Sequence, residues 1–252
     1  MDNNLSLKDL CIVVLENPYK NLSILEARTV FSNILDVKLR GYVAIYDEGV
    51  MPIDTTDFIA THLMIADKNN PFEKIYLTYK SISYKTCEKY NVPFPFMAIL
   101  KNNAHPSCYN EMERILNECK HKDQDLSYEA GWTIDPLVRE NKKLQNELKE
   151  VMTMFAINHH AEYNIPHWVT LGICKVKTDQ FFIQMGLKEI SAHSVLSHPY
   201  LHQTDARAII SQNGQYNDHV YEIAKKYQNL WENRITINMS SVFNKNRIKV
   251  AA

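Results

Sequence analysis

The chain alternates between short apolar runs and longer stretches in which apolar residues recur every three or four positions. The first pattern is typical of buried strands, and the second of helices that pack one face on a sheet. Strands are predicted within residues 9–18, 58–67, 73–82, 127–134, 167–174 and 206–214, and just after Gly186. Helices are predicted within residues 22–46, 107–120, 136–155, 177–186 and 220–231. This order of elements predicts an α/β fold.

We therefore expect a mixed β-sheet with helices on both faces. The sheet is assigned to a domain of residues 1–214, and the last apolar stripe to a C-terminal helical extension, residues 215–252. Residues 89–106 hold three of the nine prolines and show no clear period. They are expected to belong to an insertion, at about residues 85–124, that wraps over the core.

Composition narrows the functional classes. The chain has 252 residues, of which 45% are hydrophobic and 23% charged, as in ordinary soluble proteins. A formal net charge of -1 supplies no overall field for nucleic acid. Six glycines, without GxGxxG or a Walker loop, argue against the glycine-rich nucleotide motifs. No signal peptide or membrane span is expected, and five scattered cysteines favour free thiols in a reducing cytoplasm.

Residues 127–148, "SYEAGWTIDPLVRENKKLQNEL", read as a strand that ends at Asp-Pro and restarts as a helix. Asp135 suits the N-cap position and Pro136 the first helical position. A helix N-terminus attracts phosphate, but this one lacks the glycines that let a backbone approach it closely. Two interpretations remain open: a loosely used phosphate site, or an ordinary helix whose charges cover a solvent face.

Three stretches resemble the GNAT acyltransferase superfamily, over roughly residues 9–214. Residues 132–141, "WTIDPLVREN", are similar to the V-x-P-x-x-R pattern of its central strand and pyrophosphate loop. Residues 177–190 resemble its late helix, which commonly ends in Phe-Tyr-x-x-x-Gly-Phe before a strand. Residues 38–67 resemble one branch, the autoinducer synthases and related N-acyl amino acid synthases. Its layout of an Arg, two spaced Asp and a His-Leu strand start is matched by Arg40, Asp54, Asp57, His62 and Leu63.

The resemblance implies a GNAT-like sheet whose central strand, with Glu129, separates from the strand at 168–173 to leave a V-shaped opening. It implies that Glu129 is the general base for the amine. A partly buried carboxylate is expected to have a raised pKa, which suits proton abstraction near neutrality. The alternative is that Glu129 is a solvated residue near a strand end.

The resemblance also implies donor contacts. If the strand bulges as in the family, the N–H groups around Thr133 and Ile134 would polarise the thioester carbonyl. The side chains of Arg139, Lys142 and Lys143 would hold the phosphate of the acyl donor, either acyl-CoA or acyl-carrier protein.

Four positions depart from the family pattern. Lys142 and Leu144 stand where the pyrophosphate loop has glycines, and Phe182 where the late helix often has its general-acid Tyr. Trp132 stands where the autoinducer branch usually has an Arg. The replaced glycines favour acyl-carrier protein over free CoA as the donor, because the autoinducer branch accepts the carrier protein.

On the substrate side, the resemblance implies that Arg40, Asp54 and Asp57 order the small-molecule amine. Trp132, Trp168 and Phe182 are candidates for substrate contacts. The aromatic and methionine side chains near the central strands would line an acyl slot, or else simply form core: Met152, Met154, Phe155, Trp168, Phe181, Phe182 and Met185.

The histidines gather in "HHAEYNIPH" and "HSVLSHPYLH", namely His159, His160, His167, His193, His198 and His202. Neither segment has HExxH or the cysteine spacing of a structural zinc site, so no metal is expected.

The sequence thus predicts an N-acyltransferase that moves an acyl group from a carrier-protein or CoA thioester to a small amine such as an amino acid. The rival is a catalytically inactive GNAT-like module that binds an acyl ligand or a protein partner. Acyl length, acceptor and oligomeric state stay open.

Overall fold

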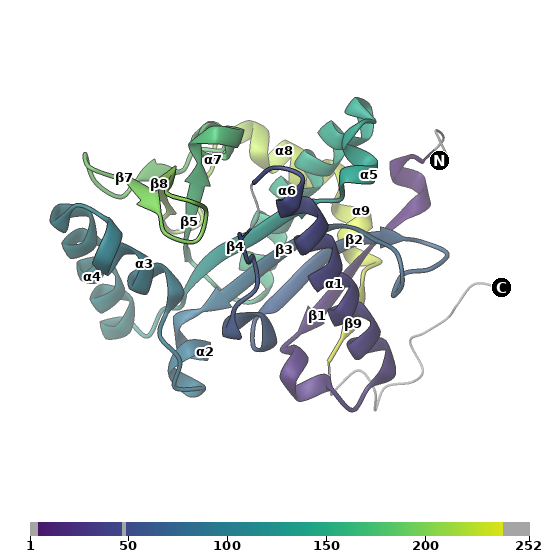
Figure 1. The fold of residues 1–252 in the computed structure, drawn as a ribbon, viewed down its shortest axis with the longest axis horizontal. Coiled ribbons are helices and arrows are strands. Elements are labelled where there is room, and N and C mark those ends of the chain that lie inside the picture. The colour runs from purple at the N-terminus through teal and green to yellow at the C-terminus, as the bar shows by residue number, and fades with distance from the viewer. Residues whose placement is uncertain (1–4, 47–48, 239–252) are drawn as a thin grey trace.

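The computed structural model describes residues 5–46 and 49–238. Its strands form one mixed sheet in the order β6-β8-β5-β4-β3-β2-β1-β9, with β7 paired to β8 (Figure 1). Their bounds are β1 Leu10–Glu16, β2 Thr61–Asp67, β3 Ile75–Ser83, β4 Leu126–Ile134, β5 His167–Ile173, β6 Lys188–Glu189, β7 Val195–His198, β8 Thr204–Ser211 and β9 Ile235–Ile237. Of the expected C-terminal extension, residues 239–252 lie outside the described part.

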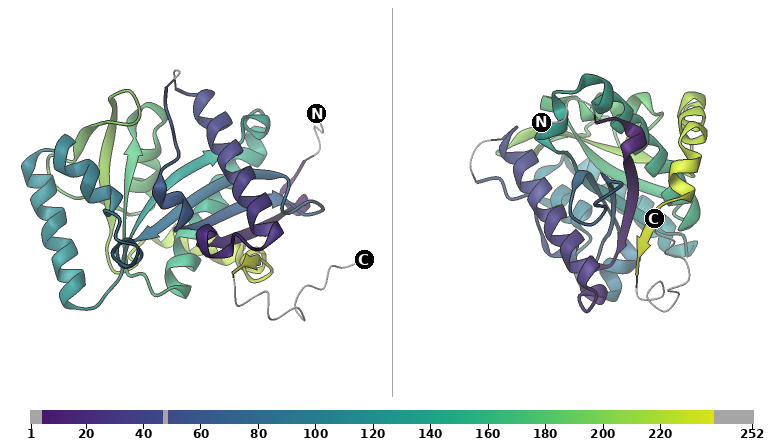
Figure 2. Two further views of the ribbon diagram at one scale, coloured as in Figure 1. Left: turned by 60° about the horizontal axis from the view of Figure 1, so that its bottom comes forward. Right: turned by 90° about the vertical axis from the view of Figure 1, so that its right-hand side faces the viewer.

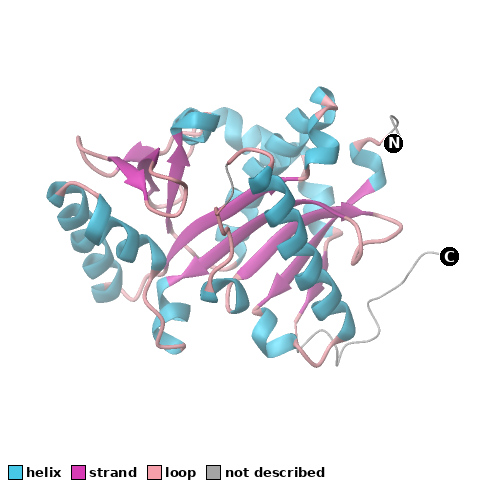
Figure 3. Cartoon of the chain, viewed as in Figure 1, coloured by secondary structure: helices cyan, strands magenta, loops and turns pink. Residues whose placement is uncertain are grey.

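Helices cover both faces of this sheet, as predicted (Figure 3). Their bounds are α1 Leu25–Val43, α2 Tyr84–Lys89, α3 Pro95–Asn103, α4 Pro106–His121, α5 Pro136–Arg139, α6 Lys142–Glu162, α7 Thr178–Gln184, α8 Asp218–Lys226 and α9 Gln228–Glu232. None of the described helices is long and apolar enough to cross a bilayer.

Strand periodicity divides the core between the two faces. On β1, Val13 and Leu15 pack with α1, whereas Ile12 and Val14 pack with α6, α8 and α9. The right-hand view of Figure 2 shows α1 on one side of the strands and the yellow C-terminal helices on the other. Because successive strand residues face opposite ways, a residue's position along β4 decides which layer it meets.

The strands β4 and β5 run parallel and separate part-way along. Their register pairs begin at Leu126 with His167 and end at Glu129 with Thr170. Beyond Glu129, β4 continues to Ile134 beside β3 alone, and Figure 1 shows β5 diverging from it. The V-shaped opening predicted between these strands is therefore confirmed.

A β-bulge lies just past the point of separation. Between Lys80 and Thr78 on β3 there is one residue, whereas between their partners Ala130 and Thr133 on β4 there are two. The extra residue lies at Gly131–Trp132, where Gly131 has a φ of 63°. A bulge of this kind re-aims the strand and interrupts its pairing.

Three local features differ from the sequence-based expectation. The segment expected to be irregular contains α3, because Pro95 at the first helical turn begins a helix rather than breaking one. The helix expected from Pro136 stops after one turn and restarts as α6, where the Asn141 side chain caps the Leu144 N–H. The strands β7 and β9 were not predicted, and β9 pairs parallel with β1.

Candidate active site

A cleft of about 720 Å³ opens where β4 and β5 separate. Its walls come from both faces of the sheet, with Tyr42 of α1 and Ile99 of α3 on one side and Lys149 of α6 on the other. Glu129 and Gly131 line it at the separation point. Ligand sites for small molecules commonly measure about 300–1,000 Å³, so the cleft is of suitable size.

The Glu129 carboxylate is buried, with 1% of the residue exposed. Its Oε1 accepts hydrogen bonds from Ser81 Oγ at 2.8 Å, from Ser127 Oγ, and from His160 Nε2 at 2.8 Å. Its Oε2 has no hydrogen-bond partner among the described residues. One oxygen is thus fixed by three donors. The other is buried without a hydrogen-bond partner, and burial and Glu129 together raise the pKa of the Tyr79 hydroxyl.

The expectation of a raised pKa for Glu129 is wrong. Burial raises it, but His160, by charge and by hydrogen bond, together with His159 and Ser127, holds the pKa below its ordinary value. The sequence suggested burial alone, whereas the structure adds the donors. Glu129 is therefore a carboxylate at neutral pH, ready to accept a proton.

The bulge leaves the backbone of Gly131 and Trp132 without a register partner on either neighbouring strand. Thr133 and Ile134, the predicted thioester contacts, pair in register with β3, at Thr78 and Leu77, and both line the cleft.

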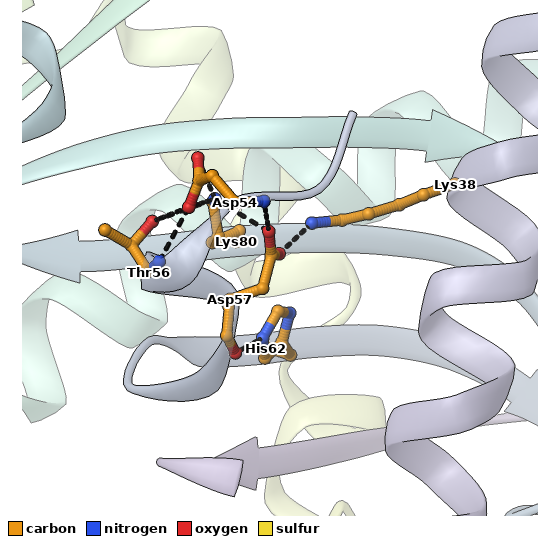
Figure 4. Close-up of polar contacts among 6 residues, drawn as sticks. All are labelled: Lys38, Asp54, Thr56, Asp57, His62 and Lys80. Atoms are coloured by element: carbon orange, nitrogen blue, oxygen red, sulfur yellow. Dashed lines mark hydrogen bonds and ion pairs between the residues drawn. The ribbon is translucent and has the colours of Figure 1, made fainter. Parts of the chain in front are cut away.

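An ion cluster lies beside the bulge, beneath the loop that carries the two predicted Asp residues (Figure 4). Asp57 is fully buried and pairs with Lys38 and, at 3.3 Å, with Lys80. Lys80 also reaches Asp54 at 3.1 Å. His62 Nε2 donates to the backbone oxygen of Asp57 at 2.7 Å.

In this cluster, burial disfavours the charged forms of the side chains, whereas the ion pairs favour them. It lowers the pKa of Lys38 to about 8, although Asp57 favours the charged form. Burial also opposes ionisation of Asp57, but Lys38 and Lys80 hold its pKa well below the usual range. Burial and Lys38 lower the pKa of His62 to about 4, so its ring is neutral.

Sequence reasoning missed both lysines. Lys38 follows Val30 and Ile34 at helical spacing on the buried stripe of α1, and Lys80 interrupts the apolar run of β3. A lysine at such a position indicates a buried ion pair, because lysine is almost never fully buried unless it is paired.

We expect Gly131→Ala to lower the free energy of unfolding by about 2–4 kcal/mol, measured by urea denaturation. The left-handed φ contributes roughly 1–2 kcal/mol. The added Cβ would also lie 2.9 Å from Lys38 Cε and Nζ, in the buried ion cluster. Gly214→Ala is the matched control, since Gly214 has a φ of 60° and nothing within 4 Å of an added Cβ. Equal losses in the two variants would show that the approach to Lys38 is unimportant.

The start of α5, the candidate phosphate site, is filled by the chain's own side chain. Asp135 accepts from the Leu137 N–H at 2.8 Å and pairs with Arg40 at 2.6 Å. Arg139 donates to the backbone oxygens of Ile134, at 2.8 Å, and Gly41, at 3.0 Å. A buried carboxylate at this helix start disfavours a bound phosphate.

Apart from Trp168, the predicted site residues fall into three groups. Those lining the cleft are Asp54, Glu129, Trp132, Thr133, Ile134, Arg139 and Phe182. Arg40 and Asp57 lie outside the lining, engaged in the ion pairs just described. Lys142 and Lys143 are exposed on the first turn of α6.

The aromatic candidates connect the cleft to the core. The Trp132 ring contacts Phe181 and Phe182 at a tilt, with ring centroids 5.0 and 5.8 Å apart. Trp168 lies deeper, donating to Tyr216 Oη at 2.7 Å. The other candidates for an acyl slot pack in the core or beside it: Met152, Met154, Phe155, Phe181 and Met185.

The histidines gather around no candidate metal site among the described residues. His159 and His160 are buried in α6, and the rings of His105 and His193 are in tilted contact, with centroids 4.4 Å apart.

No protein-family model and no curated protein matches this sequence. BjaI, a CoA-dependent acyl-homoserine lactone synthase solved with SAM and isopentyl-CoA, matches 94% of this chain and 99% of its own, with 8% identity and a TM-score of 0.51. The chain has the fold of the GNAT acyltransferases.

Two further structures align over smaller shares. FeeM, an N-acyl amino acid synthase from uncultured soil microbes, is 14% identical and covers 73% of this chain and 85% of its own, with a TM-score of 0.44. LasI, an AHL synthase, is 12% identical and covers 80% and 89%, with a TM-score of 0.46. Within the GNAT fold, the cleft of this chain lies at the parting of β4 and β5.

Proposed function

We propose that the chain is an N-acyltransferase, which moves an acyl group from an acyl-carrier-protein or acyl-CoA thioester to the amine of a small molecule such as an amino acid. The observation that carries this proposal is Glu129, a buried carboxylate that lines the cleft and keeps one oxygen unpartnered. The five free cysteines suit a reducing cytoplasm, where we place the chain.

The reaction follows from the positions of base and bulge. The amine arrives as an ammonium, and Glu129 takes one proton, directly or through a water. The amine nitrogen then bonds to the thioester carbon, and the N–H groups of Gly131 and Trp132 stabilise the charge that develops on oxygen. The carbon–sulfur bond breaks, and the second nitrogen proton passes to sulfur. The products are an amide, a thiol and one proton released to solvent.

On the acceptor side, we assign Asp54 to the amine, because it lines the cleft and its side chain is half exposed. Asp57 acts one layer deeper, holding Lys80 and Lys38 in place. Arg40 serves the acceptor side only indirectly, through its ion pair with Asp135.

The proposal is tested by incubating the purified chain with acyl thioesters and a panel of amino acids. We expect an N-acyl amide whose mass equals the acyl group plus the amine, less water. Hydrolysis to free acid, without any amide, would contradict the proposal.

We expect tighter binding of acyl-carrier protein than of free CoA. Asp135 occupies the start of α5, where the phosphate of CoA would bind. Lys142 and Lys143 are exposed and would attract the acidic surface of a carrier protein. The double variant Lys142→Glu/Lys143→Glu should raise the KM for acyl-carrier protein by roughly tenfold, through electrostatic repulsion. Lys225→Glu, a charge reversal at an exposed position of α8, is the control. Micromolar binding of acetyl-CoA by calorimetry, with no carrier-protein binding, would contradict this expectation.

A second candidate is an inactive module that binds an acyl ligand or a protein partner. Phe182 favours it, because this side chain lines the cleft without a hydroxyl to protonate a leaving thiolate. Binding of an acyl thioester without its consumption would support this candidate.

A further inference from the structure

His160, on α6, is hydrogen-bonded to Glu129 and has no role in the chemistry proposed above. His160 Nε2 lies 2.8 Å from Glu129 Oε1, and only 4% of His160 is exposed. Its ring stacks on Trp168, with centroids 5.4 Å apart and planes 23° from parallel. Stacking and hydrogen bond together fix the orientation of the imidazole.

The other ring nitrogen of His160 is free. Within the described part of the chain, His160 Nδ1 is buried and has no hydrogen-bond partner. An unpartnered buried nitrogen is unfavourable unless water or a proton reaches it.

A second cavity lies against His160. It has a volume of about 240 Å³ and is lined by the end of α6 and the loop after β8, including His160, Asn164, Asn213 and Tyr216. We call it the rear cavity. Glu129 lines the cleft and His160 lines the rear cavity, so the hydrogen-bonded pair connects the two spaces.

Few other ionisable groups lie near the Glu129–His160 pair. Those that act on the pair or on the adjacent His159 are Tyr79 on β3, His159 itself on α6, Tyr216 after β8 and Arg234 before β9. Burial raises the pKa of Tyr79 and Tyr216, and burial and His160 lower the pKa of His159 to about 3. Tyr79, Tyr216 and His159 are uncharged near neutrality, and the charge of Arg234 is paired with Glu162. The remaining charge at this place is set by Glu129 and His160.

We propose that His160 is a positioning residue for Glu129, and that it exchanges its Nδ1 proton with solvent through the rear cavity. This inference rests on the proposed N-acyltransferase function. The Nε2–H stays on Glu129 Oε1 and leaves Oε2 to accept the ammonium proton. With Nδ1 protonated the pair is neutral, and with Nδ1 free the pair carries one negative charge. Capture of an ammonium therefore requires the deprotonated imidazole.

The first test is the pH dependence of kcat/KM for the amine. His160→Gln keeps an N–H donor toward Glu129 but removes the titrating group. We expect the acid limb of its profile to move to lower pH by about one unit or more, with kcat near the top of the profile reduced far less. An acid limb unchanged from wild type would overturn the proposal.

The second test is rescue through the rear cavity. His160→Ala should lose roughly tenfold or more in turnover at neutral pH, and added imidazole should restore several-fold. His159→Ala is the matched control, because His159 is the next residue of α6, equally buried and without a hydrogen-bond partner among the described side chains. Absence of rescue in His160→Ala, or equal rescue in His159→Ala, would assign His160 a packing role only.

Failure of this inference differs from failure of the proposed function. If wild type transfers no acyl group, the function fails, and the pair is then judged by the NMR signal of the His160 Nε2–H. This proton should be protected from exchange in wild type by its hydrogen bond to Glu129 Oε1, and its resonance should shift in Glu129→Gln, because the acceptor loses its charge. An unchanged resonance would show that the two groups are not hydrogen-bonded.

Discussion

Glu129→Gln is expected to lower turnover by about 10²–10⁴-fold while the fold is kept. Proton abstraction by a positioned base contributes that range, which is roughly 3–5 kcal/mol of barrier. The amide retains an oxygen to accept from Ser81, Ser127 and His160, and its nitrogen takes the place of the unpartnered Oε2. The measurement is kcat at saturating amine, together with the thermal midpoint, which should move by less than about 4 °C.

Two companion results sharpen this expectation. Glu129→Asp should be intermediate in rate, because the carboxylate survives but retreats by one methylene. The acid side of the pH profile should change in Glu129→Gln, because the carboxylate of the Glu129–His160 pair, which accepts the proton, is gone. A Gln variant that keeps more than half of the wild-type rate would transfer the role to another residue or to water. An unfolded Gln variant would mark Glu129 as structural.

Asp57→Asn is expected to lower the free energy of unfolding by about 3–5 kcal/mol. Removing one partner of a buried ion pair leaves the other charge uncompensated. Here two lysines depend on Asp57, and Lys38 is fully buried. Urea denaturation at pH 7 measures the loss, with Glu118→Gln as control. Glu118 pairs with Arg114 where both side chains are about half exposed, so that change should stay within roughly 0.5–1 kcal/mol.

The effect of Asp57→Asn should depend on pH in a defined direction. Because Lys38 and Lys80 hold the pKa of Asp57 below its ordinary value, its ionised form stabilises the fold above the unfolded pKa of about 3.9. This contribution is lost as pH falls through the lower pKa of the folded state. The difference between wild type and variant should therefore shrink below about pH 4. A constant difference down to pH 3 would contradict the assigned charge of Asp57.

Elements with a strong local pattern were predictable from sequence. The apolar stripe of α1, the buried runs of β1 to β5 and the cap at Asp135 each depend on residues close together in the chain. Element order and short motifs were then enough to predict that β4 separates from β5. The strand β9 was not predictable in this way, because three residues gain their strand character only from pairing with β1.

The candidate site was predictable in part. Glu129 was found because it lies on the central strand, but its pKa direction was not, since His160 lies 31 residues away and meets it only in the fold. The same limit hid Lys38 and Lys80, whose charges are compatible with burial only because Asp57 joins them. Long-range polar pairs are set by tertiary packing, which no local period encodes.

The central claim, acyl transfer to an amine at the Glu129 cleft, is tested most directly by thiol release from an acyl thioester. The wild-type chain is mixed with acyl-carrier protein or acyl-CoA, with and without each amine of a panel, and free thiol is followed in time. We expect release that depends on one class of amine, saturates with its concentration, and nearly disappears in Glu129→Gln. Tight binding of the acyl donor, with thiol release at the background rate for every amine, would contradict the account and leave an acyl-binding module.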